Sequence, residues 1–80
     1  MKHLSIFVRA EWDDVARVWV ATSNDIAGLA VEAKTMEELN RKVTNAISDL
    51  IELNGVDSDL AEIPVHIMAE QLSRVPNPCR

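Results

Sequence analysis

The sequence has few cysteines and glycines and no long hydrophobic run. Its single cysteine, Cys79, rules out a disulfide within the chain, so we expect a cytoplasmic protein. No apolar run approaches the ~18 residues that a membrane-spanning helix needs. We expect no signal peptide either, because Arg9 and Glu11 interrupt the N-terminal stretch. With only two glycines, the chain has no glycine-rich loop of the kind that cradles phosphate.

Positive charge is also scarce. Eight basic and thirteen acidic side chains give a formal net charge of −5. Affinity for nucleic acid depends mostly on Lys and Arg contacts with phosphate, so we expect no direct nucleic-acid binding. An acidic surface is better suited to a basic protein partner, because opposite potentials favour encounter and disfavour wrong pairings.

What the 80 residues do contain is a clear alternation of strand and helix patterns. Period-two alternation predicts strands over residues 3–12, 16–22, 29–33 and 63–72, and spacing of three and four predicts a helix over 35–54. Pro64 favours a sheet edge for the last strand. We therefore predict one α+β domain over residues 1–72, in the order β-β-β-α-β, with one helix on one face of a four-stranded sheet. Residues 73–80 are predicted to be a flexible tail.

Turn and cap residues mark the boundaries of these elements. Thr35 followed by Glu38 matches a capping box at the start of the helix, and Gly55 suits its end. Residues 23–25, Ser-Asn-Asp, are typical of a turn. Gly28 is expected to serve a backbone conformation that other residues do not adopt.

The first two strands are close enough to form a hairpin, and their register decides which side chains share a face. A three-residue loop, 13–15, places Trp12 opposite Ala16 and Arg9 opposite Trp19. One face is then nearly all apolar. Phe7, Arg9 and Trp19 fall on the other face, which a single helix leaves bare, so we predict these three residues at a partner or dimer interface.

The adjacent acids Asp13 and Asp14 are the strongest candidates for chemistry. Neighbouring residues of a strand point to opposite faces, so two adjacent carboxylates rarely bind one ion together. A hard cation also needs more oxygen ligands, and Asp25 and Glu32 are the only nearby ones. The favoured interpretation is a hairpin corner. We predict no catalytic residue, no metal ligand and no cofactor, and keep a degenerate metal-dependent nuclease as the alternative.

Several short motifs together resemble the HicB-like antitoxin group, and most closely a subfamily of small, uncharacterised bacterial proteins within it. The matching segments cover roughly residues 4–70: Trp12-Asp13, Trp19-Val20-Ala21, Asp25-Ile26-Ala27-Gly28-Leu29 and Thr35-Met36-Glu37-Glu38-Leu39. Ala27 departs from the pattern, which usually has proline there.

The resemblance implies a degraded ribonuclease-H-like fold without its catalytic acids. It also implies a non-enzymatic antitoxin that binds and neutralises a small basic HicA-type ribonuclease toxin, and we expect this protein to form a homodimer. Relatives that act as repressors carry an added DNA-binding segment, which the sequence does not show after residue 72. An orphan structural protein without a toxin is a further alternative.

Overall fold

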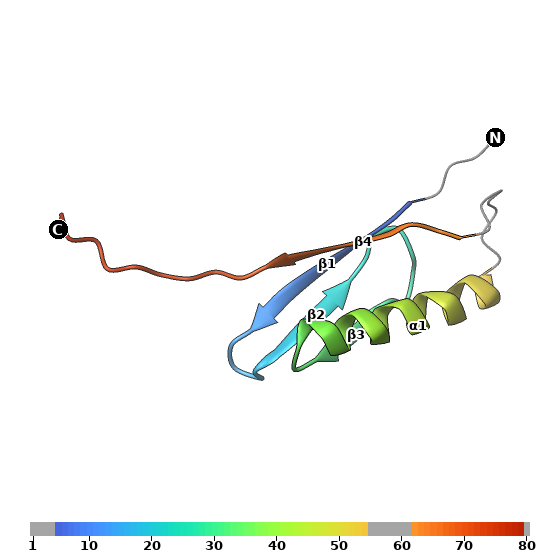
Figure 1. The fold of residues 1–80 in the computed structure, drawn as a ribbon, viewed down its shortest axis with the longest axis horizontal. Coiled ribbons are helices and arrows are strands. Elements are labelled where there is room, and N and C mark those ends of the chain that lie inside the picture. Colours follow the sequence, from blue (N-terminus) through green and yellow to red (C-terminus); the bar gives the residue numbers. More distant parts are fainter. Residues whose placement is uncertain (1–4, 55–61, 80) are drawn as a thin grey trace.

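The computed structural model describes residues 5–54 and 62–79 and confirms the predicted order β-β-β-α-β. Four strands form one sheet, and a single helix lies along one side of it (Figure 1). The elements are β1 (Ile6–Asp13), β2 (Val18–Thr22), β3 (Ala30–Ala33), α1 (Met36–Asn54) and β4 (Val65–Glu70). No helix in the described residues is long and apolar enough to cross a membrane.

The sheet has the strand order β3-β2-β1-β4 and is mixed. β1 pairs with β2 and β2 pairs with β3 in antiparallel fashion, whereas β4 returns to lie parallel to β1. The chain can join β1 and β4 in parallel because the helix crosses over between β3 and β4. β4 is therefore an edge strand, as the position of Pro64 predicts.

One face of the sheet and one stripe of the helix form the core. Fully buried apolar side chains come from β1, β2, β3 and α1, including Ile6, Val8, Leu39 and Val43. The helix begins as predicted, because the Thr35 hydroxyl accepts a hydrogen bond of 3.1 Å from the backbone amide of Glu38. The predicted cap at Gly55 lies outside the described residues.

The predicted hairpin register is wrong. Trp12 lies opposite Trp19, and Arg9 lies opposite Thr22, because the loop has four residues, 14–17, instead of three. Arg17 takes the left-handed conformation, with a φ of 61°, at the point where a glycine would be usual. This change in loop parity moves every β2 side chain to the opposite face from the one predicted.

Gly28 confirms the prediction that it serves a special backbone conformation. Its φ of 89° lies in the region that residues with a Cβ atom rarely adopt. The turn around it places Ile26 and Leu29 in the core on either side. The carbon of a side chain at position 28 would also lie 3.5 Å from a methyl group of Leu50 on the helix.

After β4 the chain continues as residues 71–79, which lack helix or strand structure and end in a turn at 78–79; we call this segment the C-terminal arm. The arm runs past the β1–β2 turn and away from the sheet (Figure 1). The Cα atoms extend 55 Å along the longest axis but only 25 and 19 Å along the other two. Their radius of gyration of 15.7 Å exceeds the ~12 Å of a compact chain of this length, which agrees with a projecting arm.

Candidate functional site on the open sheet face

The sheet face turned away from α1 carries the candidate site, and we call it the open face. Side chains alternate along a strand, so those that follow the buried core residues one position later point to this face. They mix apolar and charged groups: Phe7, Arg9, Glu11, Val18, Val20, Thr22, Glu32, His66, Met68 and Glu70. Phe7 and Met68 are each about half exposed, so the face presents apolar surface to solvent.

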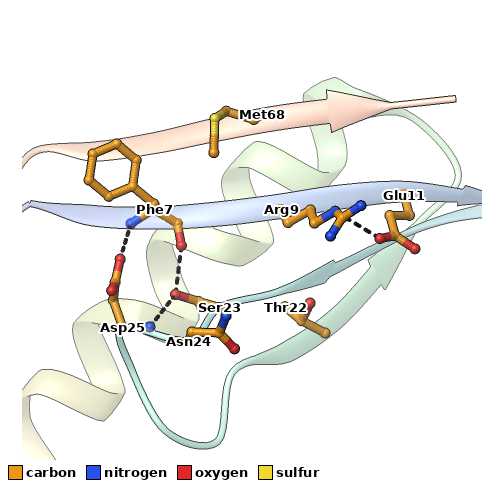
Figure 2. A pocket seen from close by; sticks show the side chains of 8 residues that line it. All are labelled: Phe7, Arg9, Glu11, Thr22, Ser23, Asn24, Asp25 and Met68. Atoms are coloured by element: carbon orange, nitrogen blue, oxygen red, sulfur yellow. Dashed lines mark hydrogen bonds and ion pairs between the residues drawn. The ribbon is translucent and has the colours of Figure 1, made fainter.

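A hollow of about 410 Å³ lies on this face where β2 ends. Figure 2 shows its side chains in front of the sheet: Phe7, Arg9, Glu11, Thr22, Ser23, Asn24, Asp25 and Met68. They come from β1, β2, β4 and the turn after β2. These are three separate stretches of the chain, since residues 22–25 are consecutive, so the hollow is shaped by the tertiary fold and no single local motif encodes it.

On one side of the hollow, side chains from the turn after β2 form hydrogen bonds with the backbone of β1 in place of a neighbouring strand. β2 ends at Thr22, so the backbone of Phe7 on β1 has no strand partner on that side. The Phe7 amide donates a 2.7 Å hydrogen bond to Asp25, and the Phe7 carbonyl accepts one of 2.7 Å from the Ser23 hydroxyl. The Asp25 amide donates in turn to that hydroxyl at 3.1 Å. The predicted turn chemistry at 23–25 is confirmed, and its role is to cap β1.

Arg9 is held between two carboxylates at the other end of the hollow. Its guanidinium lies 2.9 Å from a Glu11 oxygen and 2.7 Å from a Glu70 oxygen. The hydrogen bond to Glu70, with the charges of Glu70 and Glu11, raises the pKa of Arg9 above its usual value. All three side chains are largely exposed, so their effect on stability is small. The group carries one positive and two negative charges and leaves the open face acidic there.

The sequence interpretation missed two residues of this face, His66 and Met68. The parallel pairing of β4 with β1 places His66 beside Phe7 and Met68 beside Arg9. The His66 and Phe7 rings are stacked, with centroids 4.7 Å apart and planes 13° from parallel. The alternation of residues 63–72 indicates that both share a face, but it does not say which strand lies next to β4.

The structure separates the three predicted interface residues. Phe7 and Arg9 lie on the open face as predicted. Trp19 lies on the opposite face, where it packs against the core and meets the Trp12 ring edge-on at 5.3 Å. The predicted contact of Arg9 with Trp19 is therefore wrong; instead the Arg17 guanidinium lies 5.4 Å from the centre of the Trp12 ring.

Asp13 and Asp14 form the hairpin corner that the sequence favours. One Asp13 carboxylate oxygen accepts hydrogen bonds from the amides of Val15 and Ala16, at 3.0 and 3.1 Å. The Asp14 carboxylate pairs with Arg17 at 2.7 Å. Within residues 5–54 and 62–79, no three His, Cys, Asp or Glu side chains gather to hold a metal ion. Asp25 and Glu32, the other acids of the nuclease alternative, lie on different strands or turns from this corner.

Fold and site together define a small α+β domain with one covered and one open sheet face. The chain belongs to a family described as a domain of unknown function, DUF1902, whose model matches residues 5–76. That match includes β1 through β4 and the first part of the C-terminal arm. It agrees with the predicted subfamily of small uncharacterised proteins, whereas the wider HicB-like relationship stays a prediction.

A solved structure supports the same fold. The chain is similar to the crystal structure of a hypothetical protein, TTHA1013, from the extremely thermophilic bacterium Thermus thermophilus. The two are 40% identical, with a TM-score of 0.70, and the match covers 92% of this chain and 100% of the other. A comparison with curated proteins finds no match.

Proposed function

We propose that this protein is a non-enzymatic, dimeric binding module of the cytoplasm that neutralises a small basic ribonuclease toxin. The observation that carries the proposal is the open face, where the exposed Phe7 and Met68 lie beside the acidic group around Arg9. Apolar anchors beside exposed charge are typical of surfaces that bind other proteins. The resemblance to HicB-like antitoxins agrees with such a role.

Charge supports a basic partner. The net charge of −5 favours encounter with a cationic protein at long range. On the open face, Arg9 keeps Glu11 and Glu70 close together, so their two carboxylates form one patch that a Lys or Arg of the partner would meet. Phe7 and Met68 then supply the apolar contact that fixes the complex once the charges have brought it together.

The test begins with the adjacent reading frames: where one encodes a small basic protein, the chain is produced together with it. We expect the chain to relieve growth arrest caused by that protein and to purify with it as a complex. Glu11→Lys should weaken the complex by at least ~10-fold, because it reverses charge within the open face. Asp49→Lys is the matched control: it makes the same change in charge on the exposed surface of α1 and should leave binding nearly unchanged.

Two results would overturn the proposal. One is the absence of both binding and rescue by the unmodified chain. The other is magnesium-dependent ribonuclease activity of the chain itself, which would favour a degenerate nuclease. Equal weakening by Glu11→Lys and Asp49→Lys would contradict the assignment of the open face and leave only a general effect of net charge.

A further inference from the structure

The C-terminal arm carries apolar side chains that its own domain does not bury. Leu72 is 77% exposed and Val75 is 86% exposed. The family match continues to residue 76 and so includes both residues. An extended segment that belongs to the family's domain and presents large apolar groups to solvent is suited to a surface on another molecule.

The outer edge of β4 is a surface of the required kind. The order of the described strands leaves β4 paired on one side only, with β1. The Ile6 amide donates to the Pro64 carbonyl at 3.0 Å, so the backbone of residue 64 points inward to β1. The direction of the backbone N–H and C=O groups alternates along a strand, so those of Val65, Ile67 and Ala69 point away from β1. The backbone groups of Gln71, Ser73 and Val75 continue this outward row in the arm. The three prolines, at 64, 76 and 78, all fall on the inward positions and leave this outward row of amides intact.

An apolar groove lies beside this edge on the helix side. It has a volume of about 350 Å³ and is lined by Thr44, Ile47, Ser48, Ile51, Glu52, Ile63 and Val65. α1 packs mainly over β2 and β3, so its C-terminal half and the start of β4 do not close over each other. A strand added along the edge of β4 would place every second side chain into or beside this groove.

We propose that residues 71–75 of the C-terminal arm pair with β4 of a second copy of this chain, and that the second arm pairs reciprocally. The two strands run antiparallel about a twofold axis at Glu70, so that two four-stranded sheets join into one. This inference rests on the dimeric part of the proposed function and is independent of toxin binding.

The geometry of the ladder fixes the register. Residues whose backbone amides and carbonyls point outward must lie opposite one another to exchange hydrogen bonds. In β4 and the arm these are the odd-numbered residues. A twofold axis at a residue pairs odd positions with odd positions, whereas an axis midway between two residues would pair odd with even and is excluded. With the axis at Glu70, Val75 lies opposite the partner's Val65 and beside the apolar groove. Leu72 then lies opposite the partner's Met68 on the open face. Moving the axis by one residue would instead set Leu72 against the partner's Glu70 or the partner's His66.

This register brings the two Glu70 carboxylates together at the axis, which is unfavourable for like charges. Each Glu70 already binds Arg9 at 2.7 Å, so two guanidinium groups offset the repulsion. At the axis, the proposed dimer therefore depends on the ion pair between Arg9 and Glu70 in each copy. It also places the acidic groups of both copies side by side, which extends the surface offered to a basic partner.

Sedimentation of the full chain tests the proposal, with Val75→Asp as the main variant. We expect the unmodified chain to sediment as a dimer and Val75→Asp as a folded monomer at the same concentration, because a carboxylate would face the apolar groove. Val15→Asp is the matched control: Val15 is 95% exposed at the hairpin tip, and the variant should stay dimeric. Circular dichroism confirms that each variant is folded.

A crosslink tests the register, in a Cys79→Ser background that removes the native thiol. Glu70→Cys should form a disulfide between copies, because directly opposed residues that share no hydrogen bonds have Cα atoms ~4.5 Å apart, within disulfide range. Gln71→Cys should not, because the two residues 71 would be offset by two positions and lie beyond ~7 Å.

The outcomes separate this inference from the proposed function. A dimer that survives Val75→Asp and forms no crosslink at position 70 would overturn the arm pairing while leaving the dimer itself intact. Efficient crosslinking at 71 in place of 70 would overturn the axis at Glu70. An unmodified chain that is monomeric at every concentration would overturn both the arm pairing and the dimeric state, whereas rescue from the toxin would still report on the open face separately.

Discussion

The two faces of the sheet are built from the same strands but serve different ends. The helix face is apolar and covered by α1 except beside β4, and Ile6, Val8 and Leu39 are fully buried in it. The open face alternates apolar and charged groups and is organised by hydrogen bonds and ion pairs at its surface. All of the buried side chains in the described residues belong to the cluster on the helix side of the sheet, so that face supplies most of the hydrophobic stabilisation. The other face is then available for binding.

Two leucines on the same helix give the sharpest test of this division. Leu39→Ala removes a fully buried side chain and should lower the free energy of unfolding by ~2–5 kcal/mol. Leu53→Ala makes the same change where the side chain is 81% exposed, and should alter it by less than ~0.5 kcal/mol. Denaturant unfolding of both variants measures the difference. Equal losses would mean that the core is not where the helix face places it.

Trp19 tests whether its side chain lies on the helix face, as the observed hairpin register places it. Its half-buried ring packs against the core and Trp12, so Trp19→Ala should lower the free energy of unfolding by ~1–3 kcal/mol. Self-association of the folded fraction should be unchanged. Denaturant unfolding and sedimentation of the same sample measure the two effects. Weaker association with unaltered stability would restore Trp19 to an interface and contradict the observed register.

Asp25 tests whether side chains shape the open face. Asp25→Ala removes the acceptor for the Phe7 amide and should lower the free energy of unfolding by ~1 kcal/mol, because the bond is near the surface. Hydrogen exchange of the Phe7 amide should become faster in the variant, and this measurement is specific to the lost bond. Asn24→Ala, at the adjacent position in the same turn, is the control. Unchanged exchange at Phe7 would show that the cap does not protect β1.

The elements of the fold could be predicted from the sequence because each has a local signal. Alternation marks the strands, spacing of three and four marks α1, and Thr35 and Gly28 mark positions with specific backbone needs. Hairpin register was predicted wrongly because alternation favours a three-residue loop, which sets the valines of β2 on the apolar face. The observed four-residue loop depends on Arg17 taking the left-handed conformation, which its residue type does not indicate.

The sequence predicted a site residue correctly only where the alternation within a single strand was enough to place it on the open face. Phe7 and Arg9 lie on the open face because the alternation of β1 places them there. Placing Trp19 on a face required the hairpin register, and because the predicted register is wrong, Trp19 was predicted on the wrong face. His66 and Met68 join the site because β4 lies parallel to β1, a pairing between segments more than 50 residues apart that no local pattern encodes.

The bonds from Ser23 and Asp25 to Phe7 also explain how a hairpin with no glycine in its turn keeps a single alignment. A slide of one strand past the other would pull the Phe7 backbone away from both side chains at once. The bonds to Phe7 thus hold the register at the end of the hairpin farthest from the turn. At the turn itself, the Arg17 amide donates a hydrogen bond to the Asp13 carbonyl. A hairpin held at both ends resists a shift of register, so the side chains of the open face keep one fixed arrangement.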